Sequence, residues 1–126
     1  MEPLFLEGKE DTPKIILNSQ SNQYLISGRS LPEDATSFYS PVLKWLDEFS
    51  TQTVADPNVK FEVRLEYFNT ASSKLLLDIF SKLEGLSENG KKVTVQWYYS
   101  EDDEDMLEAG EEYSELVDLK FEMKTY

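Results

Sequence analysis

The amino-acid sequence predicts an α/β fold: one domain, residues 1–126, in which a mixed β-sheet is covered by helices. Three observations support this fold class. The chain has 126 residues, the length of one ordinary domain, and 40% of them are apolar, which is enough for a packed core. Alternating apolar residues predict strands and apolar residues at helical spacing predict helices, in the order β-β-α-β-α-β-α-β. A strand, a helix and a second strand in succession normally form a right-handed parallel crossover.

The first half of the chain predicts a hairpin followed by a helix. Residues 14–18 (KIILN) and 23–27 (QYLIS) are the two strands, joined by the polar turn SQSN. After SLPED, an apolar stripe at helical spacing predicts the helix; its members are Phe38, Val42, Trp45, Leu46 and Phe49. Pro41 leaves two possible starts, because proline fits a first helical turn better than a helix interior. The helix begins near Glu33 and kinks, or it begins at Pro41 with Ser40 as its N-cap.

The second half alternates between strand and helix. The predicted strands are 60–68, 92–99 and 119–126, and the predicted helices are 72–86 and 103–117. Gly90, in the turn SENG, is able to adopt the left-handed conformation that often follows a helix. Gly110 weakens the helical pattern of the last helix. Because both faces of the strand 92–99 carry aromatic residues, we expect one helix against each face.

Composition excludes several classes of function. The chain has no histidine and no cysteine, which excludes triads with a histidine base, disulfides, histidine phosphorelay and most zinc sites. A net charge of −13 repels nucleic-acid phosphates and anionic membranes. No apolar run reaches the ~18 residues that cross a bilayer, and MEPLFLEGKED lacks a signal-peptide pattern. We expect a cytoplasmic protein with a protein partner, without a cofactor, metal or catalytic residues, and without nucleic-acid or direct membrane contact.

A run of small polar residues stands between the strand 60–68 and its helix. It consists of Asn69, Thr70, Ala71, Ser72, Ser73 and Lys74. One interpretation is a helix start, in which Asn69 or Thr70 is the N-cap and the serines are solvated. The other is an anion or phosphorylation site, because a helix N-terminus offers free N–H groups and a positive dipole end, to which Lys74 adds a cation. The run lacks the glycines of a phosphate-binding P-loop.

The stretch 101–112 (EDDEDMLEAGEE) is strongly acidic. Eight of its twelve residues are Asp or Glu and none is basic. One interpretation is a solvated helix start that the helix dipole favours. The second is a docking surface for a partner. Calcium binding is a third interpretation, although the spacing does not match an EF-hand loop.

Six aromatic residues stand close to these stretches: Phe38, Tyr39, Trp45, Trp97, Tyr98 and Tyr99. We expect most of them in the core. Tyr39 or Tyr98 is a candidate exposed anchor for a partner, a role in which buried aromatic contacts dominate binding energy.

An ordered set of motifs carries a resemblance to a known family. The motifs are TPKI at 12–15, GRSLPED at 28–34, FYSPVLKWLDEF at 38–49, EYFNTASSKLLLDIF at 66–80, VQWYY at 95–99 and EDMLEAGEEY at 104–113. Together they span nearly the whole chain. On these motifs the sequence resembles the SiaC-type regulatory phosphoproteins of bacteria, whose fold is similar to STAS domains.

That resemblance implies a switch in a partner-switching system. A Ser/Thr protein kinase phosphorylates a threonine in the loop before the central helix, and a PP2C-like phosphatase removes the phosphate. The unphosphorylated form binds a GGDEF diguanylate cyclase and promotes synthesis of cyclic di-GMP, which favours biofilm and aggregation. The family threonine falls on Thr70, with Ser72 and Ser73 as secondary candidates, and residues 69–74 form the phosphate loop that contacts partners.

Two other functions remain open at this level. One is an anti-sigma-factor antagonist, the role of other STAS-like proteins. The other is a small enzyme with Thr70 or a serine as nucleophile and Lys74 or a carboxylate as base.

Overall fold

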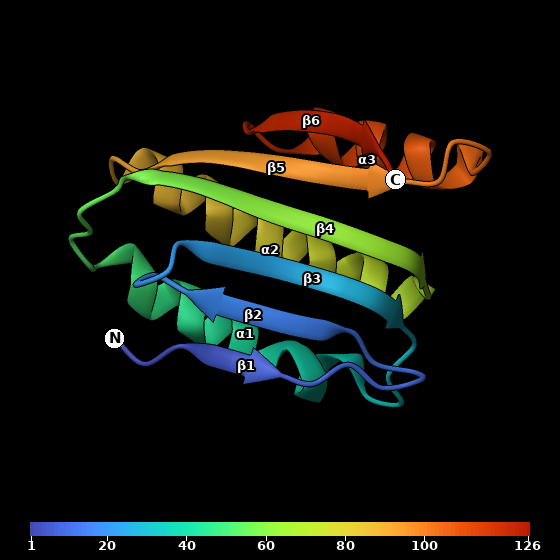
Figure 1. Ribbon diagram of the computed structural model, residues 1–126, viewed down its shortest axis with the longest axis horizontal. Helices are drawn as coiled ribbons and strands as arrows, with labels where there is room; N and C mark the ends of the chain where they lie inside the picture. The colour runs from blue at the N-terminus through green and yellow to red at the C-terminus, as the bar shows by residue number, and fades with distance from the viewer.

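The computed structural model describes all residues, 1–126, and has two layers: a six-stranded sheet and three helices (Figure 1). The elements in chain order are β1 (Leu4–Leu6), β2 (Lys14–Asn18), β3 (Gln23–Ser30), α1 (Ala35–Ser50), β4 (Asn58–Phe68), α2 (Thr70–Glu88), β5 (Lys92–Tyr99), α3 (Glu104–Leu116) and β6 (Lys120–Thr125). None of the three helices combines the length and the apolar character that a membrane span requires.

The strands lie in the sheet in the same order as in the sequence. β1, β2 and β3 pair antiparallel, whereas β3, β4, β5 and β6 pair parallel. Each of the three strand–helix–strand crossovers leads to the next strand on the same side in the sheet. Because such crossovers have the same hand, all three helices lie on the same face of the sheet. Figure 1 shows the helices behind the sheet. The α/β class and the mixed sheet predicted from the sequence are confirmed.

The structure adds one strand to the predicted elements and decides between the two predicted starts of the first helix. β1 is an additional edge strand of three residues, LFL, which is too short for an alternating pattern to reveal. α1 begins at Ala35, with Asp34 as its N-cap accepting from the backbone N–H of Ser37 at 3.1 Å. The start near Glu33 is therefore the correct alternative, and Pro41 lies inside the helix.

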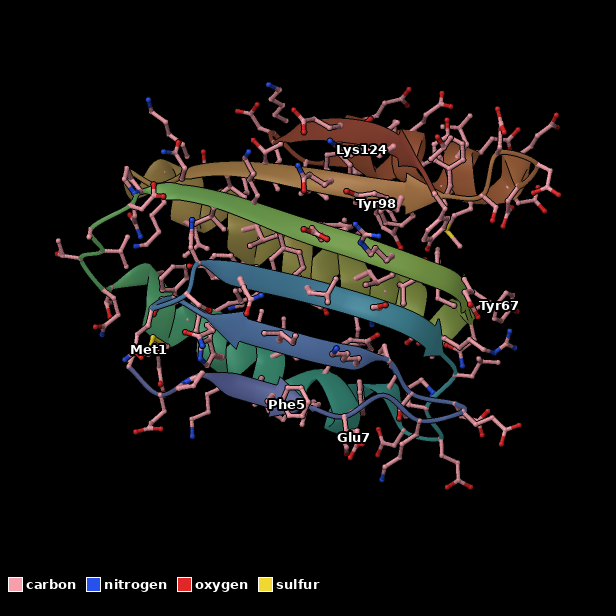
Figure 2. The ribbon with its side chains drawn as sticks, viewed as in Figure 1. Met1, Phe5, Glu7, Tyr67, Tyr98 and Lys124 are labelled. Carbon is pink, nitrogen blue, oxygen red and sulfur yellow. The ribbon has the colours of Figure 1, made fainter.

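The expectation of a helix on each face of β5 is wrong. Val95 and Trp97 face the helices and are fully buried, but Tyr98 points to the side of the sheet that no helix covers (Figure 2). There the Arg64 guanidinium lies 3.8 Å from the centroid of the Tyr98 ring. The Tyr98 ring is therefore covered by a cation–π contact with Arg64 and not by a helix.

The core lies between the sheet and the helices, and Trp97 is its largest fully buried side chain. The Trp97 indole N–H donates to the carbonyl oxygen of Met106 at 2.9 Å, which ties β5 to α3. Its ring packs near Phe80 of α2 and Tyr113 of α3, with centroid distances of 6.3 and 5.6 Å. One side chain thus fixes two helices against the sheet.

Gly110 lets α3 approach Trp97 closely, and we expect Gly110→Ala to destabilise the protein. A Cβ at this position would lie 2.5 Å from Cδ1 of Trp97, so α3 would have to move away from the sheet. Overpacking of this kind costs ~1–3 kcal/mol. Denaturant unfolding measures the loss, and Gly85→Ala is the matched control. Nothing lies within 4 Å of a Cβ at Gly85, so that variant should be unchanged or slightly more stable. Equal effects of the two substitutions would contradict the packing argument.

Candidate functional site

The small polar run lies at the edge of the sheet where the parallel strands end. β3, β4 and β5 each lead into a helix that returns behind the sheet, so the N-termini of α1, α2 and α3 gather at this one edge. Sites of α/β proteins commonly form at this edge, beyond the carboxyl ends of the strands. The run 69–74 follows the central strand β4 and therefore occupies the middle of it.

Asn69, not Thr70, is the N-cap of α2. Its side-chain oxygen accepts from the backbone N–H of Ser72 at 2.8 Å, and its backbone carbonyl accepts from Ser73 at 3.0 Å. Its own N–H donates to the carbonyl oxygen of Ser30 at the end of β3, at 3.0 Å. The helix consequently begins at Thr70, two residues before the predicted start, and its first turn is anchored to the neighbouring strand.

Ser72 belongs to a buried chain of three hydroxyls. Its Oγ donates to the carbonyl oxygen of Ser30 at 3.0 Å and accepts from Ser30 Oγ at 2.8 Å. Because a hydroxyl has one proton, Ser30 Oγ must accept in its 2.6 Å contact with Tyr39, so the Tyr39 hydroxyl is the donor. Burial raises the pKa of Tyr39 to about 12, which keeps that proton in place at neutral pH. The chain runs from α1 through β3 into the first turn of α2.

Ser73 fixes the same turn to α3. The Tyr113 hydroxyl donates to the Ser73 carbonyl oxygen at 2.8 Å, so the Ser73 hydroxyl must be the donor in their 3.0 Å side-chain contact. Burial raises the pKa of Tyr113 above its ordinary value, so this phenol also stays protonated at neutral pH. The first turn of α2 is therefore held from two sides, by α1 and β3 through Ser72 and by α3 through Ser73.

Thr70 differs from both serines. It is the first residue of α2, it is exposed, and its hydroxyl makes no hydrogen bond to another residue. Lys74, one turn further along the helix, is also exposed and forms no salt bridge. Residues four apart share a helix face, so a group added to Thr70 would have this cation on its own side of α2.

The structure corrects two sequence-based expectations at this site. The serines are not both solvated, because Ser72 is completely buried and its hydroxyl is fully engaged. A kinase would have to open the fold to reach it, which argues against Ser72 as a secondary acceptor. Tyr39 is not an exposed anchor, since it too is completely buried.

Three residues of the site were not predicted to belong to it: Ser30, Tyr39 and Tyr113. They lie between 9 and 42 residues from their hydrogen-bonding partners, so no local motif marks them. The one available signal was that a buried tyrosine needs a partner for its hydroxyl. This rule predicts that the Tyr39 hydroxyl forms a hydrogen bond, but it does not identify the partner residue.

The acidic stretch forms the start of α3. Asp103 is the N-cap, accepting from the backbone N–H of Met106 at 3.0 Å, and Glu104 and Asp105 lie in the first turn, where the helix dipole favours negative charge. The structure brings together no group of three or more acidic side chains that would hold a metal ion. This helix start lies beside residues 66–68 at the end of β4, which directly precede the run that contains Thr70.

The fold is a sheet covered by helices on one face, with one free hydroxyl among three at the start of its central helix, and the family match gives its class, that of regulatory phosphoproteins. The chain belongs to the SiaC family of regulatory phosphoproteins, whose family model matches residues 6–126. It is 29% identical, over 128 residues, to an uncharacterized protein of Pseudomonas aeruginosa (strain UCBPP-PA14), covering all of this chain and 98% of that protein.

Solved structures show the same likeness in three dimensions. SiaC of Pseudomonas aeruginosa superposes with a TM-score of 0.88 at 26% identity, over 100% of both chains. A second structure is the crystal structure of the diguanylate cyclase SiaD in complex with its activator SiaC, from the same organism. Its matching chain gives a TM-score of 0.88 at 27% identity, over 98% of this chain and 99% of that one.

Proposed function

We propose that this chain is a non-enzymatic cytoplasmic switch whose unphosphorylated form binds and activates a GGDEF diguanylate cyclase. The cyclic di-GMP that results favours biofilm and aggregation. A Ser/Thr protein kinase phosphorylates Thr70 and so ends the activation, and a PP2C-like phosphatase restores it. Support for the cyclase as partner comes from the SiaC chain that activates SiaD, which this chain matches over nearly its whole length.

One observation carries the choice of Thr70 as the phosphorylated residue. The run 69–74 contains three hydroxyls. Those of Ser72 and Ser73 form hydrogen bonds that hold the first turn of α2, whereas that of Thr70 is exposed and forms no hydrogen bond to another residue. A kinase can therefore reach Thr70 without breaking a contact that maintains the fold. No histidine exists in the chain to activate Thr70 as a nucleophile, so an accessible acceptor fits this site better than a catalytic one.

Phosphopeptide mapping after incubation with the cognate kinase tests this assignment. We expect one phosphate, on Thr70, and none on the Thr70→Ala variant. Ser73→Ala is the matched control, because it removes a neighbouring hydroxyl and should still accept phosphate at Thr70. Since Asn69 is the cap, Thr70→Ala should change the free energy of unfolding by no more than about 0.5 kcal/mol. Phosphate confined to residues outside 70–73, or found on Ser73 alone, would overturn the assignment.

A further inference from the structure

A groove lies between the end of β4, the strand that leads into Asn69 and Thr70, and the first two turns of α3. It has a volume of about 270 Å³ and is lined by residues 66–68 together with Asp103, Asp105, Met106 and Ala109. We call it the β4–α3 groove. Phe68, the last β4 residue of its lining, precedes Thr70 by two positions, so we infer that a partner seated in the groove would also meet the exposed start of α2.

The groove combines an apolar lining with an acidic mouth. Phe68, Met106 and Ala109 are buried or half-buried, whereas Glu66 and Asp105 are exposed. Tyr67 stands at the same end of the sheet (Figure 2) and is 47% exposed, a large fraction for an aromatic side chain. An exposed aromatic residue beside an apolar depression is the usual composition of a binding hot spot.

The walls of the groove are fixed before any partner arrives. The carbonyl of Met106 accepts from the Trp97 indole at 2.9 Å, and the N–H of Met106 is held by the Asp103 carboxylate at 3.0 Å. Phe68 packs edge-on against Trp97 with ring centroids 6.2 Å apart. Binding to such a preformed depression requires little ordering of the protein, which favours affinity.

From this arrangement we propose that the β4–α3 groove is the docking surface for the cyclase, and that it receives a segment with an apolar anchor side chain flanked by Lys or Arg. Charge complementarity selects the flanking residues, because every charged side chain that lines the groove is acidic. The acidic stretch at the start of α3 then gains a role, as the part that attracts this basic segment. The proposal rests on the proposed function, since it names the surface that the cyclase uses.

The position of the groove also explains how a phosphate on Thr70 would act on a basic partner. Such a phosphate would lie beside the groove, on the part of α2 that the partner covers, and it would lose its water when the partner packs against it. Dehydration of a charge opposes binding whatever the sign of the partner's charge. Salt screening should therefore not relieve the inhibition, although it would relieve simple charge repulsion.

Calorimetric titration of the purified cyclase with full-length variants tests the groove. Glu66→Lys and Asp105→Lys should each weaken binding by about tenfold or more, and Tyr67→Ala by about 30-fold, the size of a hot-spot loss. Glu88→Lys makes the same charge change at the far end of α2, and Phe5→Ala removes another exposed aromatic side chain. Both controls should bind within about twofold of the unmodified chain, the range of a surface substitution away from an interface.

Two further readouts separate the outcomes. Every variant should still accept phosphate at Thr70 and melt near the temperature of the unmodified chain, which shows that the fold and the kinase site are intact. If the unmodified chain binds the cyclase and the three groove variants bind equally well, the groove is not the docking surface. If the unmodified chain fails to bind any GGDEF cyclase, the proposed function itself is overturned, and with it the occupant of the groove.

Discussion

Phosphorylation of Thr70 is expected to weaken binding to the cyclase by at least about 100-fold while leaving the fold unchanged; that factor corresponds to ~2.7 kcal/mol. A phosphate adds about −1.5 to −2 charges at neutral pH. Its interaction with a helix N-terminus is worth ~0.3–1 kcal/mol and at most ~2. Driving a two-state change from 1:99 to 99:1 needs ~5.5 kcal/mol, so the dipole alone cannot refold the domain. Burying a doubly charged group in an unprepared interface costs several kcal/mol, which is sufficient to prevent docking.

Titration of the cyclase with singly phosphorylated protein measures this loss. Thr70→Ala should keep the affinity of the unmodified chain, and Thr70→Asp should lie between the two, because it carries only part of the phosphate charge. Amide shifts in the NMR spectrum of the phosphorylated protein should change only around residues 68–74 and their hydrogen-bonding partners Ser30 and Tyr113. The ratio of the two affinities should persist at high salt. Equal affinities, or shifts spread through the whole sheet, would contradict the mechanism.

The second large effect is expected from Trp97→Ala, which should reduce the free energy of unfolding by ~3–5 kcal/mol. Trp97 is completely buried, donates to Met106 and packs between α2 and α3, so its loss leaves a cavity and an unpaired carbonyl. Denaturant unfolding followed by circular dichroism gives the value. Tyr98→Ala is the matched control, because that ring lies on the next residue of the same strand but on the uncovered face (Figure 2). It should cost clearly less. A loss below about 1 kcal/mol for Trp97→Ala would mean that α3 is held by other contacts.

The alternating and helical patterns predicted most of the fold because they report which face of an element is buried. In β4, for example, Phe61, Val63 and Leu65 alternate with charged residues and are all buried in the structure. β1 escaped prediction because three residues give no period. The uncovered face of the sheet was not predicted either. An aromatic residue such as Tyr98 is typical of a core position in a sequence, but here its ring stacks against Arg64 on the uncovered face.

The candidate site was predicted in part, and the limit is physical. Asn69 and Thr70 stand next to a helix start, so local rules place them there. The roles of the two serines depend on residues that only the fold brings close: Ser30 and Tyr39 for Ser72, and Tyr113 for Ser73. The sequence pattern alone does not distinguish the three hydroxyls. In the structure the Thr70 hydroxyl is free, whereas the hydroxyls of Ser72 and Ser73 form the hydrogen bonds that hold the helix turn on which Thr70 lies.

Cyclase activity is the most direct test of the switch. Purified GGDEF cyclase is assayed for cyclic di-GMP synthesis with the chain in three states: unphosphorylated, phosphorylated at Thr70, and phosphorylated and then treated with a PP2C-like phosphatase. We expect activation by the first, loss of activation by the second and recovery by the third, with Thr70→Ala activating throughout and insensitive to the kinase. Equal activation by the phosphorylated and unphosphorylated chains would contradict the claim that Thr70 controls the partner.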